Sequence, residues 1–436
     1  MSLPSYSKYK DSGVEWLGNV PEGWGVTKVG FCCDFFTGWT PPTGDESSYD
    51  GDLLWANISD IGKKFLTETA KRISISAVRH YKIRIAPAGS LLFSFKLSIG
   101  QVSIADVPMY TNEAIAIFQS GTKILSHWAY YTFPVFIPKN ASENIYGAKM
   151  LNQYLIKSAK ILLPSVEEQQ NIAAFLDAET ARIDALVAEY ETLIDLLKEK
   201  RQALISQVVT KGLNPDVPMK DSGVEWLGEV PEHWRLYQTK RLFRLVVEQA
   251  PDDNNEELLS IYTSIGVRPR KSLEEKGNKA TTTNGYWIVR KGDIIVNKLL
   301  AWMGAIGLSE YDGVTSPAYD IFRRIKPLVP KYYSELFRCG IMFSEFRRHS
   351  RGIMDMRLRL YFEDFGQLVI PYPPPSEQME IVKALELELG KMDELVANAE
   401  IGINLLKERR TTLISDAVTG KIDVRTSSVV DTSDIA

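Results

Sequence analysis

Arginine side chains are concentrated in one short stretch of the second half of the chain. Residues 347–359 contain five arginines, which are Arg347, Arg348, Arg351, Arg357 and Arg359. The planar guanidinium group can donate two parallel hydrogen bonds, either to a phosphate or to the edge of a guanine base. This stretch therefore predicts contact with nucleic acid, and we place its five arginines first among the candidate binding residues.

A sparser counterpart lies in the first half of the chain, between residues 144 and 152. It contains Lys149 and Asn152, and an amide side chain can read adenine. Seven further basic residues complete the candidate set for DNA contact: Lys82, Arg84, Lys96, Arg268, Arg270, Lys271 and Lys298. An isolated basic residue is more often a solvated surface group, so this set is wider than the interface that it predicts.

Motifs that would indicate catalysis are missing from the sequence. It contains no GxxxxGK[ST] loop, no glycine-rich nucleotide turn after a strand and no [DNS]PP[YFW] methylation motif. The four histidines are scattered, and Cys32, Cys33 and Cys339 lack metal-ligand spacing. A nuclease-like pattern can be assembled only from 251–252 and 274–276, which are polar and turn-like. We therefore expect no catalytic residue and no metal site in this chain.

Positive charge is unevenly distributed along the chain. Residues 24–163 carry 14 basic and 10 acidic side chains, and residues 234–372 carry 22 and 16, which gives +4 and +6. Because the whole chain has a net charge of −4, the remainder carries −14. Two basic blocks on an acidic scaffold fit an anionic partner, although such a split also arises by chance.

The chain is a tandem duplication. Residues 10–24 and 220–234, here called the leading segments, are identical at 13 of 15 positions. Residues 168–210 align without a gap to 377–419, with 21 identities in 43 positions. Between these repeats lie two blocks with only scattered matches. Each copy therefore has the order leading segment, variable block and long repeat, and the variable blocks are expected to do different versions of one task.

Both variable blocks contain short β-like runs separated by Pro and Gly. These runs are Ser90–Phe95, Val102–Ala105 and Ile115–Phe118 in the first block, and Tyr286–Val289, Asp293–Asn297 and Tyr319–Phe322 in the second. The leading segments are rich in Gly and Pro, so they predict turns, with their tryptophans as packing anchors. The two blocks are expected to share a fold.

The long repeats predict helices of about 43 residues, or ~65 Å at 1.5 Å per residue. Gly212 and Gly420 follow them as expected C-caps. An apolar stripe at steps of three and four runs along each helix. We assign to it Leu176, Ile183, Leu186, Tyr190, Leu193, Leu197 and Leu204 in the first helix, and Leu385, Met392, Leu395, Ala399, Gly402, Leu406 and Leu413 in the second. These stripes predict an antiparallel coiled coil; the alternative is that each helix packs on its own block.

The expected fold class is α+β, with two similar α/β recognition domains joined by two long antiparallel coiled-coil helices in a pseudo-two-fold arrangement. Residues 1–163 and 213–372 each combine a leading segment with a recognition domain. Residues 164–212 and 373–425 are the central and C-terminal spacer helices, and 426–436 is expected to be a disordered tail. No apolar run approaches ~20 residues, so no membrane span is expected.

The repeated signatures resemble those of the specificity subunit of type I restriction–modification systems. They are KDSGVEWLGxVPExW, the block ends LLPSVEEQ and IPYPPPSEQ, and LLKE[KR]R…LIS…VT at the helix ends. The resemblance implies that the blocks are target recognition domains, that the helices are a spacer, and that the subunit is not catalytic. It also implies two modification subunits, which bind S-adenosylmethionine and methylate adenine, and two restriction subunits, which use ATP and Mg²⁺.

Under this resemblance, each block reads one half of an asymmetric, bipartite site in double-stranded DNA, and the spacer sets the gap between the halves. The protein would act in the cytoplasm, which the lack of a signal-like N-terminus also favours. Two alternatives stay open. One is a coiled-coil scaffold that does not bind DNA, and the other is a fragment of a fused restriction–modification enzyme.

Overall fold

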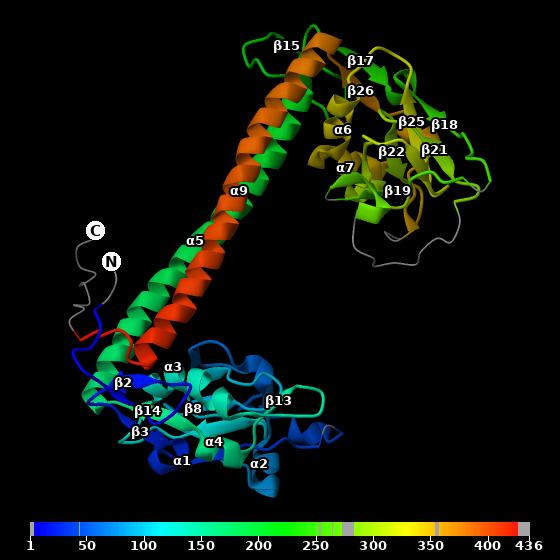
Figure 1. Cartoon of the computed structure of the whole chain (residues 1–436). Coiled ribbons are helices and arrows are strands. Elements are labelled where there is room, and N and C mark those ends of the chain that lie inside the picture. The colour runs from blue at the N-terminus through cyan, green and yellow to red at the C-terminus, as the bar shows by residue number, and fades with distance from the viewer. Residues whose placement is uncertain are drawn as a thin grey trace. The chain divides into compact units, whose positions relative to one another are not determined.

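The computed structural model describes residues 4–42, 44–252, 254–263, 265–272, 283–353 and 357–425 (Figure 1). The chain forms two compact units. Unit 1 combines residues 1–189 with 402–436, and unit 2 comprises residues 190–401. The division does not follow the order of the chain, because each long helix contributes one part to each unit. The residues assigned to the tail, 426–436, and the 274–276 portion of the nuclease-like pattern lie outside the described residues.

Unit 1 is built around a mixed sheet with the strand order β4-β11-β8-β9-β6. Its strands are β1 (Tyr9–Asp11), β2 (Asn19–Pro21), β3 (Gly25–Lys28), β4 (Phe35–Thr37), β5 (Leu53–Ala56), β6 (Phe65–Leu66), β7 (Lys71–Ile73), β8 (Leu91–Ser94), β9 (Val102–Ala105), β10 (Tyr110–Thr111), β11 (Ile115–Phe118), β12 (Ser142–Glu143), β13 (Lys149–Met150) and β14 (Lys160–Leu163). Its shorter helices are α1 (Val29–Cys32), α2 (Ile75–Tyr81), α3 (Ser126–Phe136) and α4 (Gln153–Ser158).

Unit 2 contains a four-stranded antiparallel sheet with the order β18-β25-β22-β23. Its strands are β15 (Met219–Asp221), β16 (Glu229–Pro231), β17 (Arg235–Gln238), β18 (Phe243–Val246), β19 (Leu259–Tyr262), β20 (Gly266–Pro269), β21 (Trp287–Val289), β22 (Ile294–Asn297), β23 (Ile306–Leu308), β24 (Gly313–Thr315), β25 (Tyr319–Arg324) and β26 (Val369–Tyr372). Its shorter helices are α6 (Pro330–Arg338), α7 (Gly340–Arg348) and α8 (Phe362–Phe365).

Each unit has its own central sheet, and the two sheets have the same arrangement of strands. In sequence order, β4, β8, β9 and β11 of unit 1 correspond to β18, β22, β23 and β25 of unit 2, and both sets pair antiparallel in the same order. The runs proposed from the sequence coincide with β8, β9, β11, β21, β22 and β25, within one or two residues at each end. Strands β8, β9 and β11 are buried at every position and mostly apolar, as expected of strands that are covered on both faces. The predicted common fold is therefore confirmed.

The long helices are α5 (Val166–Lys211) and α9 (Pro375–Val418). In unit 1, Leu413, Ile414 and Ala417 near the end of α9 pack in the same core as Ile172 and Leu176 near the start of α5. In unit 2, the start of α9 packs with the end of α5, through Ile381, Leu385, Val208 and Val209. The two helices run antiparallel in each unit, as the sequence predicts.

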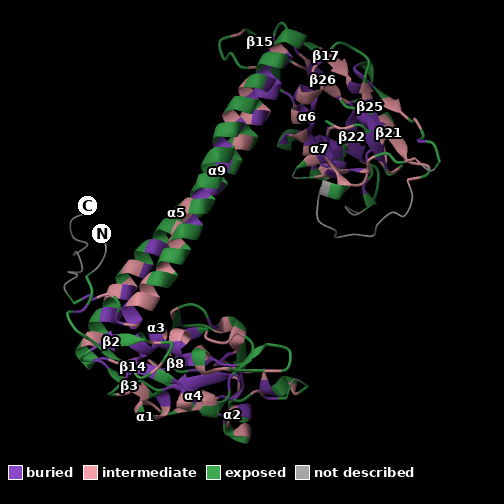
Figure 2. Ribbon diagram, viewed as in Figure 1, coloured by how far each residue is buried: buried purple, intermediate pink, exposed green. Residues whose placement is uncertain are grey.

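Burial follows the predicted layers (Figure 2). In each unit the sheet and its shorter helices enclose a buried interior, whereas the long helices are exposed apart from a narrow stripe. The leading segments dock by one tryptophan each: Trp24 and Trp234 are fully buried, while Trp16 is 43% exposed. Gly420 lies against Pro21 and Trp24, and Gly212 lies against Pro231 and Trp234. Both glycines have positive φ, in agreement with the expected C-caps.

Candidate nucleic-acid interface

Each unit presents a lysine on the loop that leaves its central sheet. Lys96 follows β8, and Lys298 follows β22. The Lys96 ammonium lies 3.7 Å from Glu113, and the Lys298 ammonium lies 3.2 Å from Asp320. Both loops then turn through a glycine with positive φ, Gly100 or Gly304, before the next strand. The structure thus brings two predicted residues from diverged blocks to equivalent positions.

The carboxylates that hold these lysines lie in different environments. Burial raises the pKa of the Asp320 carboxyl, and the charge of Lys298 offsets part of that rise. Burial also opposes the ionisation of Glu113, but a hydrogen bond from the Thr40 hydroxyl and the Lys96 charge leave its pKa lowered. The two lysine loops therefore share a geometry but differ in charge balance.

The five-arginine stretch runs from the end of α7 into a β-bridge. Arg347 lies with its guanidinium 5.5 Å from the Trp302 ring centre, and Arg348 pairs with Glu225 and Glu345. Arg351 pairs with Asp364 at 2.6 Å and forms a backbone bridge with Arg359. These ion pairs neutralise part of the predicted basic surface.

Arg357 and Arg359 lie beyond the α7 end of the same stretch and are exposed. Within the part of the chain that the structure describes, neither has an acidic partner. The backbone N–H of Leu360 donates to the Lys298 carbonyl at 2.9 Å, so this stretch lies against the lysine loop of the same unit. The second block therefore gathers Lys298 and the five arginines into one region.

The first-block candidates are less closely grouped. Lys82 caps α2 with a left-handed backbone at φ 51°, and Arg84 stacks its guanidinium 3.7 Å from the Phe36 ring centre. Lys149 is exposed on β13. The Asn152 side-chain oxygen accepts from the Leu155 N–H at 2.8 Å and caps α4. The proposed adenine contact of Asn152 therefore has to use its amide N–H groups, because its oxygen already has a structural role.

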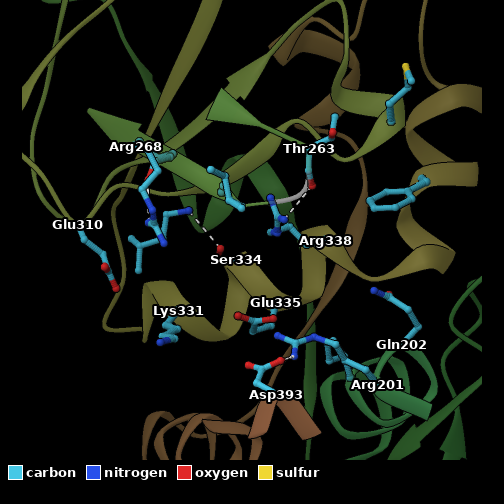
Figure 3. A pocket seen from close by; sticks show the side chains of 18 residues that line it. Arg201, Gln202, Thr263, Arg268, Glu310, Lys331, Ser334, Glu335, Arg338 and Asp393 are labelled. Carbon is cyan, nitrogen blue, oxygen red and sulfur yellow. Dashed lines mark hydrogen bonds and ion pairs between the residues drawn. The ribbon is translucent and has the colours of Figure 1, made fainter. Parts of the chain in front are cut away.

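Two of the remaining second-block candidates, Arg270 and Lys271, lie on the short turn after β20. The Lys271 ammonium is 3.2 Å from Glu257. Arg268 instead lines a pocket of about 640 Å³ between α6, the β19–β20 loop and the long helices (Figure 3). None of the five clustered arginines lines this pocket.

The pocket in Figure 3 is a joint between the recognition block and the spacer helices rather than an anion site. Arg201 on α5 pairs with Asp393 on α9 at 2.5 Å, and Lys331 on α6 pairs with Glu386 on α9 at 2.7 Å. The Arg338 guanidinium donates to the carbonyls of Thr263 and Ile306 at 2.9 and 3.1 Å.

The charges inside this pocket compensate one another. Burial lowers the pKa of Arg338, and the nearby charges of Arg201 and Arg268 lower it further, while Glu335 opposes both. Burial raises the pKa of the Glu335 carboxyl. Four cations and three carboxylates line the pocket, and Glu386 pairs with Lys331 from outside the lining, so most of the positive charge is compensated where the domain meets the helices.

Sequence reasoning missed a pair of anchors at the start of the long helices. Gln169 accepts from the Leu125 N–H at 3.1 Å and donates to the Lys123 carbonyl at 2.9 Å. Gln378, which is 209 residues later, accepts from the Val329 N–H and donates to the Pro373 carbonyl, both at 2.8 Å. Both glutamines are fully buried. Their identity in the EEQ and SEQ triplets of the two repeats was the available signal.

A second anchor pair lies two turns further along each helix. Asp177 on α5 accepts from the Tyr131 hydroxyl at 2.5 Å and pairs with Lys64. At the equivalent position of α9, Glu386 pairs with Lys331. Each recognition block is therefore held to its helix by the same two positions of the repeat, although the partner side chains differ.

The buried stripe of the long helices differs from the predicted one at four of its fourteen positions, where the following residue is the more buried of the two. Leu186, Leu193 and Leu395 are 39%, 41% and 51% exposed. The buried or half-buried positions are one residue later, at Val187, Ile194, Val396 and Ile403. The assignment of Leu186, Leu193 and Leu395 to the helix interface is therefore wrong. Each of these leucines is followed by another apolar residue, and the sequence alone does not show which of the two is buried. The other assigned positions, Leu176, Ile183, Tyr190, Leu197, Leu204, Leu385, Met392, Leu406 and Leu413, are buried or half-buried.

Two absences among the described residues bear on other kinds of function. Among them, no group of three or more His, Cys, Asp or Glu side chains is arranged to hold a metal ion. No helix in the described part of the chain is both long and apolar enough to cross a membrane.

The comparisons with known proteins agree with the geometry. A family model described as the Type I restriction modification DNA specificity domain matches residues 21–193. The type I restriction enzyme MjaIX specificity subunit of Methanocaldococcus jannaschii is 28% identical, over 37% of this chain and 38% of its own length, so that match spans well under half of the relative. The putative MjaX specificity subunit of the same organism is 23% identical over 94% of this chain and 96% of its own length.

The fold is also similar to a solved structure. A chain from a structure described as the basis of complex assembly and conformational transition of the type I R-M system has a TM-score of 0.67 and 15% identity, with 92% of this chain and 99% of that chain covered. The likeness concerns the fold. Residues 21–193 thus match the type I restriction modification DNA specificity domain, and over nearly its whole length the chain is similar to a type I restriction enzyme specificity subunit.

Proposed function

We propose that this chain reads an asymmetric bipartite site in double-stranded DNA, with one half-site for each recognition block. Similarity to specificity subunits supports DNA recognition, and the duplicated architecture supports two half-sites. The observation that carries the proposal is that both units share one central sheet and one set of helix anchors, Gln169 with Gln378 and Asp177 with Glu386, yet differ in their exposed loops. Two recognition blocks that attach to the helices in the same way but differ in their exposed loops predict two different half-sites.

The spacer helices set the gap between the half-sites in this proposal. A helix of about 43 residues spans ~65 Å, which corresponds to about 20 base pairs at the 3.4 Å spacing of each strand. Blocks that lean inward would shorten the unread gap to several base pairs. The paired charges at Arg201–Asp393 and Asp184–Arg410 fix the register of α5 and α9 within unit 2 and unit 1 respectively.

The chain positions catalytic partners rather than reacting itself. Two modification subunits, loaded with S-adenosylmethionine, would methylate adenine at N6, and two restriction subunits would supply ATP- and Mg²⁺-dependent cleavage. The proposal places none of these cofactors on this chain and places the complex in the cytoplasm. It is supported by the similarity to specificity subunits and by the sequence, which contains no nucleotide-binding or methylation motif.

The test is methylome sequencing of a methylation-free host that expresses this chain with its modification subunit. The expected result is one asymmetric bipartite N6-methyladenine motif with a fixed gap. A palindromic or continuous motif would contradict the two-reader proposal. No motif at all, with the modification subunit folded and bound to this chain, would contradict DNA recognition by it.

A further inference from the structure

The β12–β13 hairpin of unit 1 ends in a closely hydrogen-bonded tip. The Asn144 side-chain oxygen accepts from the backbone N–H groups of Tyr146 and Ala148, both at 2.9 Å. The Asn144 N–H donates to the Ala148 carbonyl, and the Gly147 N–H donates to the Asn144 carbonyl, also at 2.9 Å. Gly147 has φ 75°, which the turn requires. The tip therefore has a defined backbone conformation of its own.

This tip holds two large apolar side chains in solvent. Ile145 is 92% exposed and Tyr146 is 86% exposed. Leu151, directly after the hairpin, is buried and ties its base to the unit 1 core. Single exposed apolar residues are ordinary, but two adjacent ones on a hydrogen-bonded projection gain nothing for folding. Their position indicates a surface that is covered in a complex.

The surroundings of the hairpin are positively charged. Residues 139–160 contain Lys139, Lys149, Lys157 and Lys160 against one acidic residue, Glu143. Lys149 lies on β13 itself and is exposed. An apolar tip within a basic region fits duplex DNA, because lysines can contact the phosphates while the tip reaches the bases.

Unit 2 repeats this combination in a block of different sequence. In unit 2, Arg351 and Arg359 form a backbone bridge, and Ile353, two residues after Arg351, is 100% exposed. This region contains the five arginines described above. Both blocks therefore carry an exposed isoleucine close to basic side chains. The shared feature predicts a task common to both half-sites rather than base discrimination.

The geometry points to a DNA wedge: Ile145 and Tyr146 insert at a base step of the bound duplex, and Lys149 contacts the adjacent phosphate. This inference rests on the proposed DNA-binding function. Apolar side chains inserted between base steps unstack them at a cost of a few kcal/mol and bend the duplex. The wedge thereby deforms the DNA next to the half-site without contributing to the recognition of the half-site sequence.

The test uses the complex of the full chain with its modification subunit, bound to a duplex that carries the motif found by methylome sequencing. The base analogue 2-aminopurine, placed in turn at each step of the half-site read by unit 1 and of the base pairs that flank it, reports unstacking by its fluorescence. The double variant Ile145→Ser/Tyr146→Ser removes the wedge. Ile75→Ser, at a 53% exposed position on α2 in the same unit, is the matched control.

The expected result is a fluorescence increase at one step with the wild-type chain. The double variant should lose that increase and bind the duplex about tenfold more weakly, with the same half-site motif, while the control variant behaves as wild type. Unchanged affinity and fluorescence in the double variant would overturn the wedge and leave DNA recognition intact. Loss of the modification subunit from the complex, with DNA affinity of the remaining complex unchanged, would overturn it in favour of a protein contact. A wild-type complex that binds no DNA would contradict the proposed function instead.

Discussion

The two units differ in how the leading segment is attached to the end of a long helix: the chain is continuous there in unit 2 but not in unit 1. In unit 2, the end of α5 continues through Gly212 directly into the leading segment that contains Trp234. In unit 1, the end of α9 reaches the equivalent place, but the leading segment there is a separate stretch of chain. Non-covalent contacts replace the connection: Asp423 N–H donates to the Pro4 carbonyl at 2.7 Å, and the Tyr9 hydroxyl donates to the Gly420 carbonyl at 3.0 Å.

This comparison shows which features are needed for the common mount, by which we mean the attachment of a recognition block to the ends of the long helices. The docked tryptophan, the helix-end glycine, the buried glutamine and the carboxylate two turns later occur in both units, whether or not the chain is continuous. The polar contacts of the loops and of α3 and α6 are free to differ. Four changes test how far the equivalence extends, and we expect their effects on the free energy of unfolding to decrease in the order given.

The largest expected effect is in the helix seam, the buried interface between α5 and α9. Ile194 in unit 2 and Ile403 in unit 1 occupy equivalent positions and are both 8% exposed. Ile194→Ala and Ile403→Ala should each lower the free energy of unfolding by about 2–4 kcal/mol, through lost burial and an unfilled cavity. Denaturant unfolding, with hydrogen exchange to assign the affected unit, measures both. Leu193→Ala is the control and should cost under about 1 kcal/mol; a larger cost there than at Ile194 would restore the predicted stripe.

The second change removes the buried glutamine anchors. Gln169→Leu and Gln378→Leu keep most of the side-chain volume but leave the N–H of Leu125 or Val329 without its acceptor. Each should cost about 2 kcal/mol, because a buried unsatisfied donor costs about 1–3 kcal/mol. Equal losses in the two units, measured by the same unfolding experiment, would support a common mount. A loss confined to one unit would show that the equivalence is only in the backbone.

The docked tryptophans offer a sharper contrast. Trp234 donates its indole N–H to Glu377 at 3.0 Å, whereas the Trp24 indole N–H is buried and has no partner in the described part of the chain. Trp234→Phe should therefore destabilise more than Trp24→Phe, by about 1.5 kcal/mol, the contribution of a hydrogen bond to a charged group. Equal losses on thermal and denaturant unfolding would contradict this assignment of the two indoles.

The smallest expected effect depends on pH and is confined to unit 2. Burial raises the pKa of Glu335, so the folded state holds this proton more tightly than the unfolded state does. Its contribution to stability is therefore lost as pH rises from its ordinary value of 4.5 through the raised value. The equivalent residue of unit 1 is Tyr131, whose pKa is raised by burial and which stays neutral there. Glu335→Gln should remove this pH dependence from unit 2, while Tyr131→Phe should change no slope between pH 4 and 8.

Much of the fold could be predicted from the sequence because duplication makes its signals visible. Identical leading segments, apolar strand runs and capped helices each rest on local residue patterns. The seam register could not be ranked this way, since Leu186 and Val187 or Leu193 and Ile194 are both apolar and only packing against α9 separates them. The positions that recur every seven residues from Leu176 to Leu204 were predicted correctly, because they are all buried or half-buried.

The site was harder to predict, because the charge of a basic residue does not reveal its partner. Lys298, Arg348 and Arg351 are basic in the sequence but paired with carboxylates in the fold. Asn152 caps a helix, and Arg268 lines the joint between a domain and its spacer. The stretch 144–152 was predicted for its lysine and amides, but the exposure of Ile145 and Tyr146 within it was not, because apolar residues are usually buried in a core. Only the folded chain shows that these two are outside it.

The central claim is that the blocks read and the helices measure. The most direct test inserts seven residues at equivalent seam positions of α5 and α9, and then sequences the methylome of a methylation-free host that carries the variant with its modification subunit. The account predicts the two original half-sites with a changed gap between them. Altered half-sites with an unchanged gap would contradict it, because the helices would then take part in reading and would not set the distance.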